Sequence, residues 1–241
     1  MLFPIFFSQR RGSMLTSLDS GAVLISPEEA DIRPERTVCI TGHREKSILP
    51  YMDAPENIHL TRAVVRLLLY RYIDMAIEKG YTDFFSGLAD GTDLWAAEYV
   101  LLKKRSNDDI RLIGAMPFLK HSRFFHKEAR ILLCDVEKQA DCLVLLNSDP
   151  TVVYGKSGRQ GTSADLYRIR NYYMADNSSA VLAFFDERNP RSGTAQTVNY
   201  ALRQGRKVRS FGLSDVYSLM DEAGASFRDI GRIVKELDNI F

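Results

Sequence analysis

One short stretch of the chain combines glycine and acidic residues in the way a phosphate-binding turn does. It reads Ser86-Gly87-Leu-Ala-Asp90-Gly91-Thr-Asp93 and runs from an expected strand into an expected helix. Its glycines allow a tight turn and a close approach of the backbone to a ligand. The helix that follows begins with unpaired N–H groups at the positive end of its dipole, which attract anions. The stretch therefore predicts a phosphate-bearing ligand.

Asp93 needs a separate interpretation, because a carboxylate repels phosphate. Near a positive helix end it is suited to bind a ribose hydroxyl or to cap free N–H groups. The alternative for the whole stretch is a capped helix start without any ligand.

A second candidate lies at Gly42-His43-Arg44, directly after an apolar run. Arg44 can make a bidentate contact with phosphate. His43 can donate a hydrogen bond or titrate near neutral pH. The alternative is a loop pair held by backbone carbonyls.

Two further groups of candidate ligand contacts occur later in the chain. Arg170 and Asn171 lie in an expected helix as candidate ligand contacts. The alternative is that Arg170 pairs with Asp176 or caps the sheet edge. The stretch Ser192-Gly193-Thr194 opens the last long helix and offers N–H groups and hydroxyls to a second phosphate. We therefore expect two amide-lined pockets, near Gly87 and Gly193, that open side by side.

The remaining chemistry-bearing residues point to structural roles. Cys39, Cys134 and Cys142 show no metal-ligand spacing, so we expect buried reduced thiols and no metal. His121 and His126 are five positions apart, which is poor metal geometry on a helix. Trp95 is expected in the core. No cofactor and no catalytic residue is assigned.

The pattern of hydrophobic residues predicts the strands and helices that must position these residues. Short apolar runs predict six strands, at 37–40, 83–85, 110–116, 142–146, 180–185 and 207–211. Helical character between them predicts five helices, at 60–78, 93–104, 124–139, 164–175 and 194–204. Glycine and proline make 148–161 a surface loop.

Alternating strands and helices, with strands that are apolar throughout, predict an α/β fold. We expect a Rossmann-like, doubly wound, mostly parallel sheet with helices on both faces. Residues 1–35 form an irregular extension, 36–211 the domain, and 212–241 a helical segment packed on it. In such sheets the ligand lies beyond the carboxyl ends of the strands. The residues that follow the strands should therefore line one edge, namely Gly42-His43-Arg44, Ser86-Gly87, Met116-Pro117, Asn147 and the segment 186–193.

The charge and hydrophobicity of the chain disfavour several classes of protein. The chain has 241 residues and a formal net charge of +1, from 32 basic and 31 acidic side chains. This balance disfavours a nucleic-acid partner, which usually requires a basic face. Since no long apolar stretch occurs, we expect a cytoplasmic protein without a membrane partner. A homo-oligomer or a protein partner stays open.

Four motifs together resemble the YpsA-like family of the SLOG superfamily, over roughly residues 36–211. The motifs are Thr41-Gly-His-Arg44, Ser86 to Glu98, Arg170-Asn-Tyr-Tyr-Met-Ala-Asp-Asn-Ser178 and Ser192-Gly-Thr-Ala-Gln-Thr197. The superfamily also contains the DNA-processing protein DprA and the LOG-type nucleotide phosphoribohydrolases. The resemblance implies a Rossmann-like fold and a nucleotide-derived ligand, such as an ADP-ribose-like molecule.

Departures from the family pattern bear on activity. Tyr172 stands where the family often has arginine, and Arg191-Ser192-Gly193-Thr194 supplies only one glycine. LOG-type enzymes carry a catalytic glutamate where this chain has Thr197. The primary hypothesis is therefore a ligand-binding sensor or regulator. The alternatives are a LOG-type N-glycosidase that uses Asp93, Glu98 or His43, and a DprA-like single-stranded DNA binder.

Overall fold

The computed structural model describes residues 20–48, 55–152 and 163–222. Six parallel strands form one sheet in the order β4-β3-β2-β1-β5-β6. The strands are β1 (Thr37–Gly42), β2 (Asp83–Ser86), β3 (Arg111–Met116), β4 (Cys142–Leu145), β5 (Ala180–Phe185) and β6 (Lys207–Gly212). The predicted doubly wound α/β fold is confirmed.

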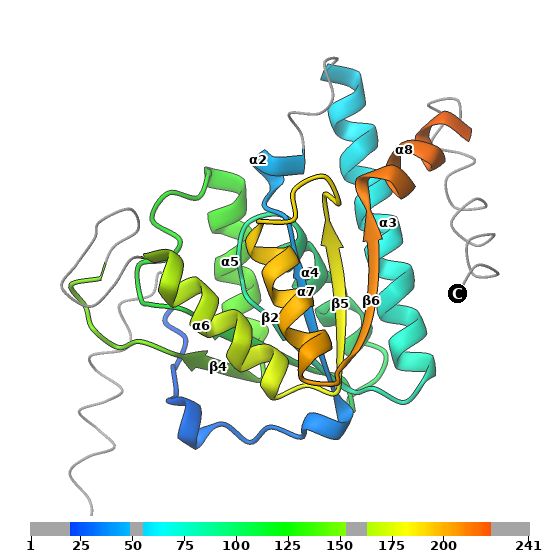
Figure 1. Ribbon diagram of the computed structural model, residues 1–241. Coiled ribbons are helices and arrows are strands. Elements are labelled where there is room, and N and C mark those ends of the chain that lie inside the picture. The colour runs from blue at the N-terminus through cyan, green and yellow to red at the C-terminus, as the bar shows by residue number, and fades with distance from the viewer. Residues whose placement is uncertain (1–19, 49–54, 153–162, 223–241) are drawn as a thin grey trace, which may run out of the picture.

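Helices cover both faces of this sheet, as Figure 1 shows. They are α2 (Glu45–Ile48), α3 (Pro55–Glu78), α4 (Thr92–Lys104), α5 (Lys127–Gln139), α6 (Ser163–Asp176), α7 (Gly193–Arg203) and α8 (Leu213–Glu222). Because side chains alternate along a strand, neighbouring residues enter different cores. Val38 and Ile40 of β1 join the larger core, with α3, α4, α5 and α8, whereas Cys39 joins the core beneath α6 and α7.

Two helix starts differ from the sequence expectation. Expected from Leu60, α3 begins earlier, at Pro55. The prediction of a helix from Phe124 was wrong, since α5 begins at Lys127. His126 is its N-cap, and the ring nitrogen Nδ1 lies 3.4 Å from the Ala129 backbone nitrogen.

The described residues that precede β1 are irregular, and they are joined to the sheet. Two single 3₁₀ turns, Pro27–Glu29 and Pro34–Arg36, are their only regular elements in the described part of the chain. Ile25 pairs with the outer edge of β4, donating to Leu143 and accepting from Leu145, each at 2.9 Å. Arg33 then forms an ion pair with the buried carboxylate of Asp83. The segment thus closes one edge of the sheet.

The strand order reverses direction at β1, which has β2 on one side and β5 on the other. In open α/β sheets such a reversal leaves a crevice at the carboxyl ends of the two strands. His43 follows β1 there and Asp186 follows β5. In sheets of this kind, such a crevice is the usual position of a binding site.

Candidate functional site

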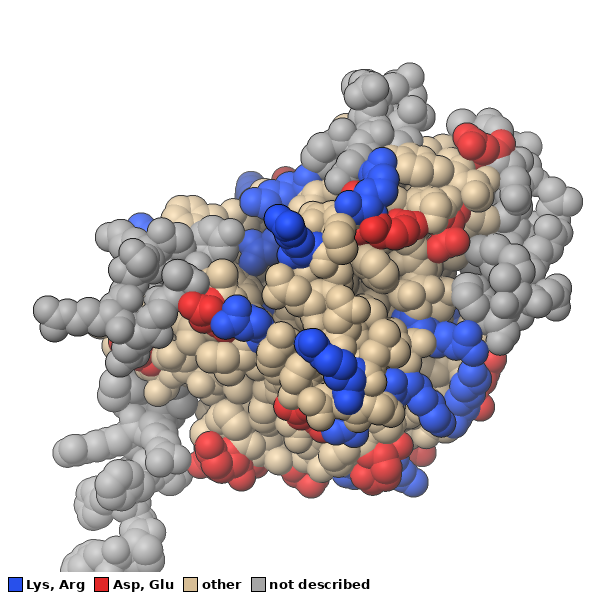
Figure 2. All heavy atoms as spheres, viewed as in Figure 1, with Lys and Arg blue, Asp and Glu red and all other residues tan. Residues whose placement is uncertain are grey.

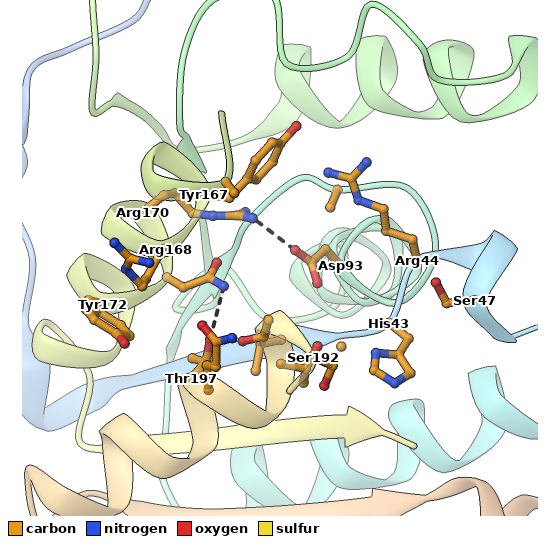
Figure 3. Close-up of a pocket in the computed structure, with 18 of the residues that line it drawn as sticks. His43, Arg44, Ser47, Asp93, Tyr167, Arg168, Arg170, Tyr172, Ser192 and Thr197 are labelled. Atoms are coloured by element: carbon orange, nitrogen blue, oxygen red, sulfur yellow. Dashed lines mark hydrogen bonds and ion pairs between the residues drawn. The ribbon is translucent and has the colours of Figure 1, made fainter. Parts of the chain in front are cut away.

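A cavity of about 610 Å³ occupies the crevice between β1, β5 and the helices α6 and α7. Most of the predicted ligand contacts line it, namely Gly42, His43, Arg44, Asp93, Arg170, Asn171, Ser192, Gly193 and Thr194. Figure 3 shows the side chains of His43, Arg44, Asp93, Arg170 and Ser192 converging from the loop after β1, from α4, from α6 and from the start of α7. The remaining predicted residues, Ser86, Gly87, Asp90 and Gly91, do not line it. Met116, Pro117 and Asn147 were expected at the same edge and also lie outside its lining.

The centre of the cavity wall is a buried ion pair between α6 and α4. The Arg170 side chain is 4% exposed, and its Nη1 lies 3.5 Å from Asp93 Oδ2. Within the described chain, Nε and Nη1 of Arg170 and Oδ1 of Asp93 are buried and make no hydrogen bond. The expected alternative partner, Asp176, instead accepts from the hydroxyl of Tyr200. The structure therefore does not support the alternative in which Arg170 pairs with Asp176.

Burial dominates the titration of this pair. It raises the pKa of Asp93 to about 6, although Arg170 opposes the shift. Burial also lowers the pKa of Arg170, while Asp93 favours its charged form. The pair is thus poorly solvated and incompletely bonded on both sides.

The turn at Gly87 is filled by the protein itself. A Cβ atom placed on Gly87 would lie 1.5 Å from Arg170 Nη1 and 2.6 Å from Asp93 Oδ2. Only glycine leaves room here for the guanidinium. The expected open, amide-lined pocket near Gly87 is therefore absent from this part of the described structure, and Arg170 supplies the positive charge in its place.

The rest of the same turn has structural contacts. The hydroxyl of Ser86 donates to the backbone oxygen of Asp93 at 2.8 Å and accepts from the Leu88 N–H at 3.1 Å. Gly91 has φ of +90°, and a Cβ there would lie 2.4 Å from the Glu45 backbone nitrogen. These contacts fix the start of α4 against the loop after β1.

Arg44 lines the same cavity as the Arg170–Asp93 pair and is held from two sides. Its Nε lies 3.6 Å from Asp90 Oδ1, and its guanidinium carbon lies 4.9 Å from the centre of the Tyr167 ring. The guanidinium of Arg170 also lies against Tyr167, at 5.6 Å. One aromatic ring thus positions two cations on the same cavity.

Tyr167 was not predicted, nor were the cavity residues Arg168, Tyr172 and Gln196. A signal for Tyr167 was present in the sequence. Tyr167 precedes Arg170 by three positions in an expected helix, so the two side chains share a face. Tyr172 was noted only as a departure from the family pattern, and Arg168 had no comparable signal.

The N-terminus of α7 forms the opposite wall. Ser192 is its N-cap and accepts from the Ala195 N–H at 3.1 Å. Nothing lies within 4 Å of a Cβ placed on Gly193, so this helix start is open. Asn171 reaches it from α6 by donating to Thr197 Oγ1 at 3.0 Å, and Thr197 donates to the Gly193 carbonyl at 2.8 Å.

The other candidate histidines lie away from the cavity wall. His121 is buried, with its ring edge-on to Phe118 and Phe125. His126 contacts Glu45 and Glu128, each at 3.0 Å. In the described residues, no group of His, Cys, Asp and Glu is arranged to hold a metal ion. Over the same ranges, no helix is long and apolar enough to span a membrane.

Comparisons with known proteins place this geometry in a family. Residues 38–215, from β1 into α8, match the family described as YspA SLOG. A UPF0398 protein of Bacillus cereus strain G9842 is 22% identical over 157 residues, which cover 65% of this chain and 78% of the relative. A UPF0398 protein of Macrococcus caseolyticus is 20% identical over 190 residues, covering 78% of this chain and 96% of the relative. The SPbeta prophage-derived protein YoqJ of Bacillus subtilis is 29% identical over 119 residues, 49% of this chain and 68% of YoqJ. Because the family match spans most of the chain and contains every element of the cavity, this protein belongs to the YspA SLOG family.

Proposed function

We propose that the protein binds a nucleotide-derived ligand of the ADP-ribose type, with a phosphate group against Arg170, and acts as a sensor or regulator. The observation that carries this proposal is the guanidinium of Arg170. It is buried in the cavity wall, and its Nε and Nη1 have no hydrogen-bond acceptor in the described chain. Leaving such donors unpaired is costly, and an anionic group such as phosphate in the cavity that Arg170 lines would supply acceptors to this guanidinium.

The opposite wall supports a second anionic contact. The open start of α7 presents N–H groups at Gly193 and Thr194 across the cavity from Arg170. A cavity of about 610 Å³ is also large enough for a nucleotide-sized molecule. A ligand with two phosphates, or with a phosphate and a polar base, would use both walls.

A LOG-type N-glycosidase is the second candidate function, and one observation favours it. Asp93 lines the cavity with its pKa raised by burial to about 6, in the range of a general acid. Against this, Thr197 occupies the position of the catalytic glutamate of LOG-type enzymes, and it hydrogen-bonds to Asn171 and Gly193. Glu98 pairs with Arg66, away from the cavity lining. Asp93 would then act as the acid without a second carboxylate among the cavity residues of the described chain.

A DprA-like single-stranded DNA binder receives the least support. On the face shown in Figure 2, Lys and Arg side chains form separate groups with Asp and Glu between them. A protein that tracks a nucleic-acid backbone needs a continuous basic groove. Absence of a mobility shift with a labelled oligonucleotide at low salt would dispose of this candidate.

Thermal-shift and calorimetric titrations test the primary proposal. The panel comprises ADP-ribose, NAD, cyclic nucleotides and nucleoside monophosphates. At a concentration of 100 Kd, a ligand that binds only the folded state stabilises it by about 2.7 kcal/mol, so the melting temperature must rise. If no compound raises it, the proposal fails. Release of free base, absent in an Asp93→Asn control, would instead support the hydrolase.

A further inference from the structure

His43 is held at the edge of the cavity by a backbone hydrogen bond. The N–H of Asp186 donates to its Nε2 at 2.8 Å, and this bond is buried. Gly42 and Phe184 are register partners on β1 and β5, so each of the bonded residues lies just beyond that pair. The sheet itself therefore brings the imidazole to the Asp186 N–H.

This bond determines which ring nitrogen carries the proton. A backbone N–H can only donate, so Nε2 must be the unprotonated nitrogen. A neutral imidazole then carries its proton on Nδ1. Burial lowers the pKa of His43, opposed by the carboxylates of Asp186 and Glu187, and thus favours the neutral ring.

The protonated nitrogen faces a different environment. Nδ1 has no hydrogen-bond partner among the described residues. It is also absent from the fully buried polar atoms that lack a partner, so it is accessible. Since His43 lines the cavity and its ring packs edge-on to Phe184, the route to Nδ1 is from the cavity. Figure 3 shows His43 at the end of the cavity next to Ser192.

We infer that Nδ1–H of His43 donates a hydrogen bond to an acceptor oxygen of the bound ligand. This inference rests on the proposed function and adds a specificity-determining contact to it. The donor cannot also accept, so it selects an oxygen of a phosphate, hydroxyl or carbonyl and rejects an amino group at that position.

The same geometry removes His43 from acid–base chemistry. To take up a proton at Nε2, the ring must give up the bond from Asp186 and leave that N–H unpaired in a buried position. His43 is therefore a fixed donor. Of the residues considered for the hydrolase, only Asp93 is left as a proton carrier on the cavity.

NMR of the free protein labelled with ¹⁵N-histidine tests the protonation state directly. At pH 7 we expect the His43 Nδ1 signal in the range of a protonated ring nitrogen and the Nε2 signal in the range of an unprotonated one. A charged ring, or a proton on Nε2, would overturn the inference whatever the protein binds.

Two substitutions separate the two ring nitrogens, with ADP-ribose and inorganic phosphate as probes. In His43→Gln the amide oxygen replaces Nε2 as acceptor for Asp186, and the donor at Nδ1 is lost. We expect an unchanged melting temperature and about a tenfold weaker affinity, the effect of one hydrogen bond. In His43→Asn the amide replaces Nδ1, so we expect a lower melting temperature and a smaller loss of affinity.

The outcomes distinguish the inference from the proposed function. If the wild type binds a probe and His43→Gln binds it equally well, the donor role is wrong and the proposed function stands. If the wild type binds neither probe nor any compound of the nucleotide panel, the proposed function fails and the donor role falls with it.

Discussion

The chemistry of this cavity depends on a few side chains, above all on Arg170. Its guanidinium is buried, faces the cavity and has one carboxylate at 3.5 Å as its counter-ion. Arginine can present two parallel donors to a phosphate, whereas lysine presents a point charge. The role of Arg170 therefore depends on the shape of its side chain as well as on its charge.

Arg170→Lys should weaken the binding of sulfate or of a nucleotide by roughly ten- to a hundredfold, the effect of losing a bidentate contact. Isothermal titration measures this loss. The matched control is Arg203→Lys, because Arg203 is exposed in the last turn of α7 and outside the cavity lining. Equal affinities in wild type and Arg170→Lys would contradict the assigned role.

A substitution at Gly87 tests the same contact, because Gly87 packs directly against the Arg170 guanidinium. A methyl group there would occupy the space of Arg170 Nη1, so Gly87→Ala should push the guanidinium out of place. We expect about the same loss of sulfate affinity as in Arg170→Met. Combining both substitutions should cost no more than either alone, because they remove one interaction. Additive losses in calorimetry would show that Gly87 acts independently of Arg170.

At the scale of elements, the segment before β1 is part of the folded unit. Leu24 is 3% exposed and lies in the larger core, whereas the preceding Val23 is 66% exposed. Leu24→Ala should lower the free energy of unfolding by about 2–5 kcal/mol. Val23→Ala should change it by less than about 0.5 kcal/mol. Urea unfolding of the two variants checks this, and similar small effects would mean that the segment is not anchored.

The elements show which structural features a sequence can reveal. Strands such as β1 and β5 were predictable because their apolar runs are local signals. The start of α7 at Ser192 was predictable for the same reason, since capping depends on adjacent residues. The edge pairing at Ile25 has no such signal, because a main-chain bond to β4 does not depend on side-chain type.

The candidate site, like the fold, has parts that the sequence predicts and parts that it does not. The residues at the carboxyl ends of the strands, such as His43 and Gly193, followed from the topology. The filling of the Gly87 turn did not follow. It depends on a contact between α6 and α4 across 77 positions of the chain, from Asp93 to Arg170. Residue spacing within one element carries no information about such a contact.

At the scale of the whole molecule, two buried groups give opposing pH dependences. The pKa of Asp93 is raised by burial to about 6, so between pH 4 and 6 the folded state binds a proton that the unfolded state has released. Acidification through this range therefore stabilises the protein. Burial lowers the pKa of His121 to about 3, while the unfolded ring titrates near 6.5. Between these values the unfolded state binds the extra proton, so acidification destabilises the protein.

Removing either group should expose the effect of the other. From pH 6 to pH 5 each contributes about 1 kcal/mol of opposite sign to the free energy of unfolding. His121→Phe removes the destabilising contribution, and Asp93→Asn the stabilising one. Relative to wild type, the phenylalanine variant should gain about 1 kcal/mol over this step and the asparagine variant should lose about as much. Urea unfolding of all three proteins at both pH values measures these differences, in which the other titrating groups cancel. Three parallel stability profiles would show that neither buried group titrates as its surroundings require.

The protonation of Asp93 should also change anion binding, because Asp93 sits beside the proposed anion site. Sulfate should therefore bind more tightly to wild type at pH 5 than at pH 7, and equally at both pH values in Asp93→Asn.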